Sequence, residues 1–474
     1  TAAGTLNLTA TATDNVGVTK VEILQNGAVV STSKTYSRTF ALGQNGTYTY
    51  TVKAYDAAGN VGTQTVTVTV AIGDAPPPPP GGKRIVAYFT AWGIYARNYL
   101  PSQVPASKLT HINYAFANIS PDGKCAIGDL NADLDKSYGY PGEWDPGQLR
   151  GNFRAFKELK KTQPHLKLLI SVGGWSWSTY FSKVAATAAS RSTFVKSCVD
   201  MYIKGQFPGV DPVNGVGVFD GIDIDWEYPV GGGLPGNITS PADKQNYTLL
   251  MQEFRNQLSA VTAQTGKQYL LTIASGASPD LLANKQETKN LANVLDWINI
   301  MSYDYHGAFE SSTNFQSALN RVTGDPMASA GFYTDGTVSK MLELGVPASK
   351  IVLGVPFYGR GWGNVASTNN GLFQSGTPTK GTWDDGSSGL TGVFDYKDLK
   401  NNYEGKGYTK YFHPEAKEAY IYNPNTKIWI AYDDTQSMSA KADYILSKGL
   451  GGAMAWELSS DDGTLLDTLY QKLK

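Results

Sequence analysis

Eight short apolar segments recur after residue 84, and longer segments with helical periodicity, such as residues 150–161 and 244–264, separate them. Buried strands that alternate with helices are typical of a (β/α)8 TIM barrel, an α/β fold whose functional residues gather at the C-terminal ends of its strands. The expected strands are residues 85–89, 111–116, 166–171, 218–225, 269–274, 297–302, 351–355 and 452–456.

The distance between the last two expected strands predicts an insertion into this barrel, which we expect to span residues 84–474. Residues 356–451 lie between the two strands, far more than one connecting helix needs. They contain further strand-like segments at residues 420–422 and 427–432. We therefore expect an α+β insertion from residue 362 to residue 435.

A run of prolines at residues 76–80 marks the clearest boundary in the chain, and we expect a Pro/Gly linker over residues 73–83. Proline runs favour an extended helix and act as semi-rigid spacers. Before the linker, residues 1–72 alternate β-branched and aromatic residues with polar ones, which predicts a small all-β sandwich. Residues 46–60 resemble the late strands of bacterial Ig-like or fibronectin-like modules. The first strand is short, so we expect the chain to begin inside this module.

Composition argues against several classes of partner. The net charge is −1, which gives no long-range attraction to nucleic acid or anionic membranes, and no apolar run approaches the roughly 18 residues of a membrane helix. Cys125 and Cys198 are too few for a disulfide framework, and no Cys/His cluster suggests zinc. One bridge or two buried thiols both remain open. We expect neither a metal ion nor a cofactor.

Three carboxylates follow one another at a spacing of two in the fourth expected strand. Side chains alternate across a strand, so Asp223, Asp225 and Glu227 share the inward face, while Ile222 and Ile224 point outward. Acids this close raise the pKa of at least one of them, which keeps a glutamate protonated near neutral pH. This pattern predicts a catalytic acid, Glu227, rather than an ion-binding cluster or a solvated loop.

Several motifs resemble those of glycoside hydrolase family 18 chitinases. Residues Phe219–Pro229 match the family pattern D-x-x-D-x-D-x-E, Ser171–Gly174 match S-x-G-G, and Met301–Asp304 match M-x-Y-D. Tyr358-Gly-Arg360 follows the seventh strand and Trp456 ends the eighth. The resemblance covers residues 84–474, and each motif falls at the C-terminal end of an expected strand. It also implies that the insertion is a chitin-insertion domain.

The resemblance implies hydrolysis with retention, in which the 2-acetamido group of the substrate is the nucleophile and closes an oxazolinium ion. Glu227 would protonate the glycosidic oxygen and later act as base. Asp225 would orient the acetamide, Asp223 would share a proton with Asp225, and Tyr303 would donate its hydroxyl to the acetamide oxygen. Asp220 has the opposite parity on the strand, and we expect it to be structural.

Further residues at strand ends are expected to bind substrate, with Trp456 as the apolar floor beneath the distorted sugar. For the aromatic residues, a place in the core is the competing interpretation, and Trp177 is a further candidate. Glu457 and Asp461 are expected to contact sugar or to cap a helix, with capping preferred for Asp461. The expected substrate-binding residues are Trp456, Met301, Asp304, Tyr88, Phe89, Trp92, Trp175, Tyr228, Tyr358 and Arg360.

The expected partners are chitin and N-acetylglucosamine oligosaccharides, and we expect a monomer. The chain begins at Thr1 with neither a methionine nor a signal peptide, so we expect a mature or trimmed form. The polymeric substrate and the layout of the modules lead us to expect a secreted, extracellular protein. Two functions remain as alternatives: a chitin-binding lectin, and an endo-β-N-acetylglucosaminidase that acts on glycoproteins. For the N-terminal module, two interpretations of Tyr36 and Tyr55 are open: their rings face a bound sugar, or they lie in or near the core. The module has no tryptophan, which favours a spacer.

Overall fold

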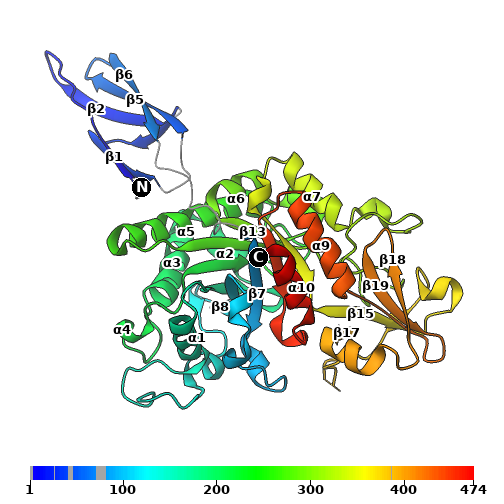
Figure 1. The fold of residues 1–474 in the computed structure, drawn as a ribbon. Coiled ribbons are helices and arrows are strands. Elements are labelled where there is room, and N and C mark those ends of the chain that lie inside the picture. Colours follow the sequence, from blue (N-terminus) through cyan, green and yellow to red (C-terminus); the bar gives the residue numbers. More distant parts are fainter. Residues whose placement is uncertain (1–3, 26, 41–45, 71–81, 386) are drawn as a thin grey trace. The chain divides into compact units, whose positions relative to one another are not determined.

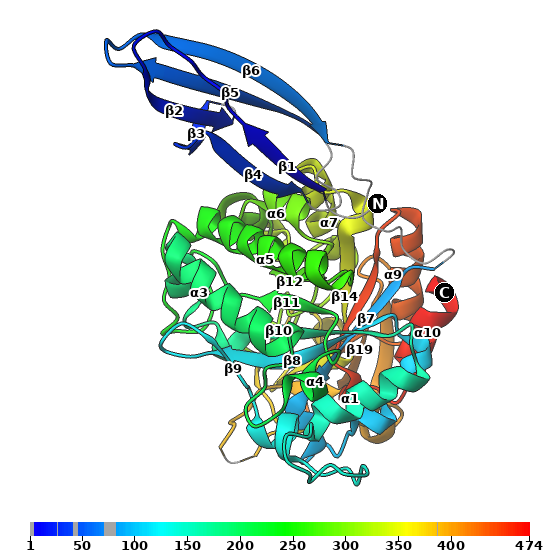
Figure 2. The same ribbon diagram turned by 90° about the vertical axis from the view of Figure 1, so that its left-hand side faces the viewer.

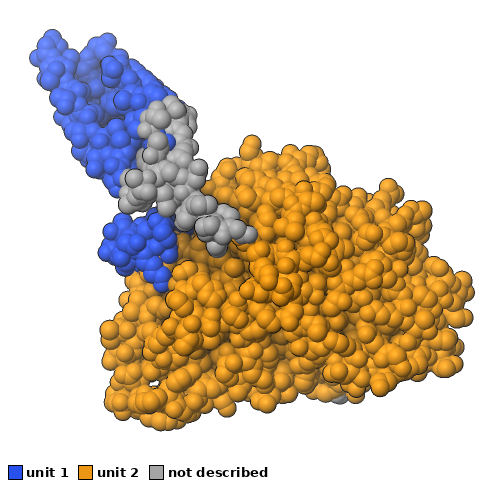
Figure 3. Space-filling model, in the orientation of Figure 1, with its two compact units in different colours: residues 1–77, 255–268 blue, residues 78–254, 269–474 orange. Residues whose placement is uncertain are grey.

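The computed structural model describes residues 4–25, 27–40, 46–70, 82–385 and 387–474. Figure 3 colours two compact units, residues 1–77 with 255–268 and residues 78–254 with 269–474, which are described separately below. Of the expected linker, residues 73–81 lie outside the described residues.

The N-terminal strands form two antiparallel sheets. One pairs β1 (Gly4–Thr9) with β4 (Thr35–Phe40), and the other has the order β3 (Ala28–Ser31), β2 (Val18–Gln25), β5 (Gly46–Asp56), β6 (Val61–Val70). The alternation of apolar and polar residues buries Ile23 and Tyr50 completely. The ring of Tyr36 lies 5.9 Å from that of Tyr50, and the hydroxyl of Tyr55 donates to Glu22 Oε2 at 2.8 Å. The expected all-β module is confirmed.

Eight parallel strands close into a barrel, because β10 pairs with β8 on one side and with β11 on the other. Figures 1 and 2 show these strands side by side, with helices such as α1 and α3 lying outside them. All eight expected strands are confirmed. In barrel order they are β7 (Arg84–Thr90), β8 (His111–Ile119), β10 (Lys167–Gly173), β11 (Gly221–Asp225), β12 (Leu270–Gly276), β13 (Trp297–Met301), β14 (Ile351–Pro356) and β21 (Gly452–Trp456).

The helices follow the apolar periodicity of the sequence. In α1, Phe153 and Phe156 lie on one face and are completely buried, because an amphipathic helix turns its apolar stripe to the barrel. Side chains cap two of the helices: Thr187 accepts from the backbone N–H of Ser190 in α3, and Asp434 from that of Ser437 in α9. The helices are α1 (Gly151–Thr162), α2 (Phe181–Ala185), α3 (Ala188–Cys198), α4 (Pro212–Gly215), α5 (Asp243–Thr265), α6 (Thr288–Val294), α7 (Thr334–Glu343), α8 (Tyr396–Asp398), α9 (Thr435–Ser447) and α10 (Thr464–Leu473).

Between β14 and β21, where the sequence has its long insertion, the chain forms another antiparallel sheet. Its order is β16-β15-β20-β19-β18, and β17 pairs with β15 beside β16, along the edge opposite β20. The completely buried indoles of Trp362 and Trp429 form the centre of its core. Its strands are β15 (Tyr358–Gly363), β16 (Thr377–Pro378), β17 (Val393–Asp395), β18 (Thr409–His413), β19 (Glu418–Asn423) and β20 (Ile428–Tyr432).

Cys125 and Cys198 form a disulfide, with their Cα atoms 5.1 Å apart. The bridge joins β9 (Cys125–Ala126) to the last residue of α3. It settles the choice that the sequence left open between one bridge and two thiols. Within the described part of the chain, no helix is long and apolar enough to span a lipid bilayer.

Candidate active site

The acidic row on β11 has the geometry that strand alternation predicts. Every residue of β11 is buried, with Ile222 and Ile224 completely covered on the outward face. The row continues past the strand to Glu227, whose backbone N–H donates to Ser178 Oγ at 2.9 Å. Ser178 follows the S-x-G-G segment of β10, and Gly174 of that segment donates its N–H to the carbonyl of Asp225 at 2.9 Å. Two neighbouring strand ends therefore fix the direction of the row.

Asp223 is completely buried and accepts hydrogen bonds from donors on four other strands. Ser171 on β10 and Thr272 on β12 are its register partners, and their hydroxyls donate at 2.7 and 2.6 Å. The Tyr88 hydroxyl on β7 donates at 2.8 Å and Asn299 Nδ2 on β13 at 3.3 Å. Burial raises the pKa of Asp223, although these four bonds act in the opposite direction.

Sequence reasoning missed Thr272 and Asn299 as partners of this row. A signal for both was present, since each is a polar residue on the inward side of an otherwise apolar strand. A buried polar group needs a hydrogen-bond partner, so these positions already indicated a buried charged or polar group nearby.

Asp225 differs from Asp223 in its partners. Its Oδ1 is buried and has no hydrogen-bond partner among the described residues. Burial, followed by the neighbouring Glu227 and Asp223, raises the pKa of Asp225 well above its ordinary value of 3.8. The environment therefore favours the neutral form of this carboxyl group, and its Oδ1 is available for a ligand.

Glu227 lies at the mouth of the row and is also largely buried. Burial raises the pKa of Glu227 from its ordinary 4.5 to about 7, while a hydrogen bond from Tyr228 lowers it and the charge of Asp304 raises it further. A carboxyl group with a pKa near 7 is suited to both donating and accepting a proton at neutral pH.

A second polar cluster lies across from the row and comes from β13 and β15. The Tyr358 hydroxyl donates to Asp304 Oδ1 at 2.6 Å, and Arg360 Nε donates to the same oxygen at 2.8 Å. Tyr303 is buried beside them, with its ring 6.2 Å from that of Tyr358. The M-x-Y-D and Tyr-Gly-Arg motifs are therefore brought together, as their positions at strand ends predicted.

These groups surround a cavity of about 1110 Å³. Thirteen residues singled out in the sequence line it, whereas Asp223 lies beneath and Phe89 lies elsewhere. The lining residues already named are Tyr88, Trp92, Trp175, Trp177, Asp225, Glu227, Tyr228, Met301, Tyr303, Asp304, Tyr358, Arg360 and Trp456.

The aromatic lining is partly exposed and partly held in place by other rings. Trp92 and Trp175 are 43% and 48% exposed, which is the state of a ring available for stacking. Trp456 lies 5.7 Å from Phe116 in a stacked arrangement and 5.2 Å from Tyr88. The lining residues Phe116, Phe309 and Phe332 were missed. Phe309 follows the M-x-Y-D motif closely, and that position was its signal.

The prediction that Phe89 binds substrate is wrong. Its ring is 1% exposed, lies 5.8 Å from Tyr114 and 4.9 Å from Phe156 of α1, and so belongs to the layer outside the barrel. The physical reason is strand alternation: Tyr88 and Phe89 are neighbours on β7, so only one of them faces inward.

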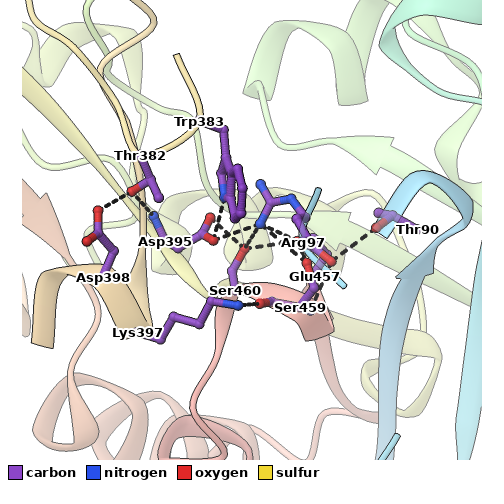
Figure 4. A network of polar contacts seen from close by, with 10 residues as sticks. All are labelled: Thr90, Arg97, Thr382, Trp383, Asp395, Lys397, Asp398, Glu457, Ser459 and Ser460. Carbon is purple, nitrogen blue, oxygen red and sulfur yellow. Dashed lines mark hydrogen bonds and ion pairs between the residues drawn. The ribbon is translucent and has the colours of Figure 1, made fainter. Parts of the chain in front are cut away.

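Glu457 is part of a structural network rather than a free sugar ligand (Figure 4). Its carboxylate accepts from the hydroxyls of Ser459 and Ser460 at 2.6 and 2.9 Å and lies 3.4 Å from Arg97. Arg97 also binds Asp395, which accepts from the indole N–H of Trp383 at 2.7 Å. The network thus ties the end of β21 to the loop after β7 and to the insertion.

The other two acids named in the sequence are also structural. Asp461 accepts from the backbone N–H groups of Leu465 and Leu466 at 3.3 and 3.0 Å and so caps α10, as expected. Asp220 Oδ2 accepts from Lys160 Nζ at 2.6 Å and from the N–H of Leu168 at 3.0 Å. The structural role expected for Asp220 is confirmed.

Comparison with known protein families gives two matches. A model described as glycosyl hydrolases family 18 matches residues 84–461, and a model described as bacterial Ig domain matches residues 1–52. The second match confirms the resemblance of the N-terminal module to bacterial Ig-like domains.

Among curated proteins, the chain is 44% identical to chitinase A1 of Niallia circulans over 82% of its own length and 36% identical to chitinase 63 of Streptomyces plicatus over 98%. It spans 58% of the former protein and 73% of the latter. Among solved structures, chitinase ChiA74 from Bacillus thuringiensis superposes with a TM-score of 0.77 at 42% identity, covering 83% of this chain and 70% of that one. The catalytic domain of chitinase B from Arthrobacter TAD20 gives 0.74 at 35% identity, covering 83% and 95%.

Proposed function

The chain belongs to glycoside hydrolase family 18, and on that premise we propose that it hydrolyses the β-1,4 linkages between N-acetylglucosamine units of chitin and chitooligosaccharides. The observation that carries the proposal is the position of Glu227, whose pKa burial raises to about 7, beside Asp225 in an aromatic-lined cavity. Sugar rings present flat apolar faces, and the exposed indoles of Trp92 and Trp175 offer surfaces of matching shape.

The distribution of carboxyl groups supports a substrate-assisted route. Asp225, Glu227, Asp304 and Glu310 are the acids that line the cavity in the described part of the chain. Asp304 is held by Tyr358 and Arg360, and Glu310 by His306 Nδ1 at 2.8 Å. Asp304 and Glu310 are thus already paired with other side chains, and we assign the reaction to the adjacent pair of Asp225 and Glu227 rather than to a protein nucleophile. Hydrolysis through the 2-acetamido group needs none.

In this mechanism Glu227 transfers its proton to the glycosidic oxygen as the bond to C1 breaks. The acetamide carbonyl oxygen attacks C1 and closes an oxazolinium ion, which carries the positive charge. Water then attacks C1 from the side that the leaving sugar has vacated, and Glu227 takes up its proton. The glutamate is protonated again at the end of the cycle, and the product keeps the β configuration.

Asp225 and Tyr303 act on the acetamide group. Asp225 accepts a hydrogen bond from the acetamide N–H and, by giving up its own proton toward Asp223, stabilises the oxazolinium charge. Tyr303 donates its hydroxyl to the carbonyl oxygen before attack. Asp223 sets the acidity of Asp225. The four donors that bind Asp223 keep its carboxyl group at a fixed distance from that of Asp225.

The remaining residues have binding and organisational roles. Trp456 forms the floor under the distorted sugar, and Met301, Tyr228, Asp304, Tyr358 and Arg360 bind the sugars around the cleaved bond. We assign residues 1–72 to the Ig-like module, 73–83 to a linker and 84–474 to the catalytic barrel. The insertion walls one side of the groove as a chitin-insertion domain. The sequence predicts it at about residues 362–435, and its sheet begins slightly earlier, with β15 at Tyr358.

We also propose that the protein is a secreted monomer that acts outside the cell. The disulfide between Cys125 and Cys198 supports export, because such bridges persist in oxidising compartments. The insoluble, polymeric form of chitin gives the same expectation.

Initial rates on chitohexaose and on a high-mannose glycopeptide test this function against the glycoprotein-directed alternative. Both substrates carry the acetamide that the mechanism needs, so the difference between their rates depends on how well the groove binds each sugar chain. We expect kcat/KM for chitohexaose to be higher by at least about 10³-fold. Chitohexaose fills several sugar subsites that the glycopeptide leaves empty, and together these subsites contribute a few kcal/mol of binding free energy. A preference for the glycopeptide would reject chitin as the substrate, and no turnover of either would reject the enzyme.

The pH dependence of kcat/KM follows from the pKa of Glu227, which burial raises to about 7. The free enzyme must hold this proton to act as acid, so kcat/KM on chitohexaose falls about tenfold for each pH unit above about 7. Ionisation of Glu227 also destabilises the fold. The pKa in the folded state exceeds the ordinary 4.5, so the free energy of unfolding decreases as pH rises from 4.5 to about 7. A rate that stays level up to pH 9 would contradict the assignment of Glu227 as the acid.

A further inference from the structure

A cluster of ionisable side chains with no solvent exposure lies in the insertion and in α9. Glu418 is on β19, Asp433 follows β20 and Lys441 is on α9, and all three are 0–1% exposed. Lys441 Nζ binds Asp433 Oδ2 and also donates to Ser317 Oγ at 2.7 Å, while Ser317 Oγ donates to Asp433 Oδ2 at 3.0 Å. We call Glu418, Asp433, Lys441 and Ser317 the buried charge cluster.

The buried charge cluster is linked to the active site through a short chain of hydrogen bonds. Glu418 Oε2 accepts from the backbone N–H of Ser317 at 3.0 Å, so it holds the segment that also contains Gln316. Gln316 Nε2 donates to the carbonyl of Tyr358 at 2.6 Å. The hydroxyl of Tyr358 then donates to Asp304 in the cavity, and the carbonyl of Gln316 accepts from the N–H of Tyr305. Both sides of the M-x-Y-D loop therefore depend on where Gln316 and Ser317 lie.

The charge of the cluster does not balance if every group ionises. One lysine and two carboxylates would leave a net negative charge with no access to water, which is strongly unfavourable. Three buried oxygens, Glu418 Oε1, Asp433 Oδ1 and Gln316 Oε1, have no hydrogen-bond partner among the described residues. A proton on one carboxyl group removes the excess charge and supplies a donor to this set of acceptors.

The proton belongs on Glu418 rather than on Asp433. Burial raises the pKa of Asp433 as well, but Asp433 is in direct contact with Lys441, whose charge favours the ionised form of this carboxyl group. Burial, followed by the charge of Asp433, raises the pKa of Glu418 to about 8, although Lys441 acts in the opposite direction. The other ionisable groups around Glu418 are His413, opposite it on β18, and Asp434, which is paired with Lys410 at 2.9 Å.

We propose that the buried charge cluster is a positioning unit for the active site: with Glu418 neutral, it holds Gln316 and Ser317, and through them Tyr358 and Asp304, in the geometry that binds substrate. The proposal rests on the proposed function of the cavity. When Glu418 ionises, two adjacent carboxylates repel each other in a place without water. The Ser317 segment then moves to relieve that repulsion, and Gln316 loses its hold on Tyr358.

Binding measured across pH tests the proposal in the Glu227→Gln background, where the catalytic acid no longer titrates and chitohexaose is turned over only slowly. We expect the Kd of Glu227→Gln for chitohexaose, measured by calorimetry, to rise about fivefold between pH 6.5 and 9.5, a coupling of ordinary size between two sites. The double variant Glu227→Gln/Glu418→Gln carries a permanently neutral side chain, so its Kd matches that of the single variant at pH 6.5 and stays there at pH 9.5. Glu415→Gln, in the exposed turn just before β19, is the matched control and leaves the pH profile unchanged.

Thermal unfolding of Glu418→Gln and of the parent chain gives a second, independent measurement. The folded pKa of Glu418 exceeds its ordinary 4.5, so ionisation of this group costs the parent stability as pH rises from 4.5 to about 8, and the variant lacks this one contribution. The Tm difference in favour of the variant therefore grows across that range. A constant Tm difference would overturn the neutral state of Glu418, and coincident Kd profiles would overturn the link to the active site. Absence of chitohexaose binding at every pH would instead reject the proposed function.

Discussion

We expect Glu227→Gln to lower kcat on chitohexaose by about 10³-fold, the size of effect that a positioned general acid supplies. Glutamine has nearly the same shape as the protonated glutamic acid that burial maintains here, so packing around the cavity changes little. It has no proton to give to the glycosidic oxygen and cannot take one from water. Single-turnover rates and the Kd for the same oligosaccharide measure the loss, and the Kd stays within a few-fold of the parent value.

The effects of Glu227→Gln on binding and on turnover distinguish a catalytic role of Glu227 from a structural one. Loss of binding together with loss of turnover would mean that Glu227 mainly organises the cavity, where its backbone N–H already binds Ser178. Turnover close to that of the parent would end the assignment of Glu227 as the catalytic acid. Circular dichroism and the unfolding midpoint of the variant show whether the fold is intact.

Asp225→Asn is expected to lower kcat by about 10²-fold or more with a much smaller effect on KM. Asparagine still offers an oxygen to the acetamide N–H, so the substrate binds. It cannot become negatively charged as the oxazolinium ion forms, so the transition state loses its stabilisation. Measuring kcat and KM separately on chitohexaose shows the split. The variant also becomes more stable relative to the parent as pH rises above 3.8, because burial raises the pKa of Asp225 and its ionisation costs stability.

Asp220→Asn is the matched control for this prediction, with the same chemical change at the residue just before β11. Asp220 points away from the cavity and binds Lys160 and the N–H of Leu168. Its variant should lose stability but keep the kcat of the folded enzyme. Equal losses of kcat in the two variants would contradict the role given to Asp225.

Much of the site could be predicted because it follows from strand periodicity. The spacing of two that separates Asp223, Asp225 and Glu227 fixed their common face, and the ends of the apolar segments located the cavity. The same rule, applied to β7, would have excluded Phe89, whose neighbour Tyr88 takes the inward side and binds Asp223. That error came from judging β7 by residue type instead of by parity.

Other features depend on contacts between distant parts of the chain, which periodicity does not contain. Cys125 and Cys198 are 73 residues apart, and nothing in their spacing chose between a bridge and two thiols. For Glu457 the sequence left open a contact with sugar or a capping role. Its carboxylate caps the turn at Leu458–Ser460 and also binds Ser459, Ser460 and Arg97. The complete burial of Lys441 and Glu418 also depends on such contacts, because charged side chains are rarely buried completely.

The four donors around Asp223 have a consequence for protein engineering. They come from β7, β10, β12 and β13, so half of the barrel strands take part in holding a single side chain. Grafting the D-x-D-x-E segment onto the equivalent strand of an unrelated barrel would transplant the acids without their support. The recipient would have to acquire a tyrosine, a serine, a threonine and an asparagine at matching heights before the graft could work. The unit that can be transferred is therefore a layer of side chains contributed by several strands at one level of the barrel, and not one continuous segment of sequence.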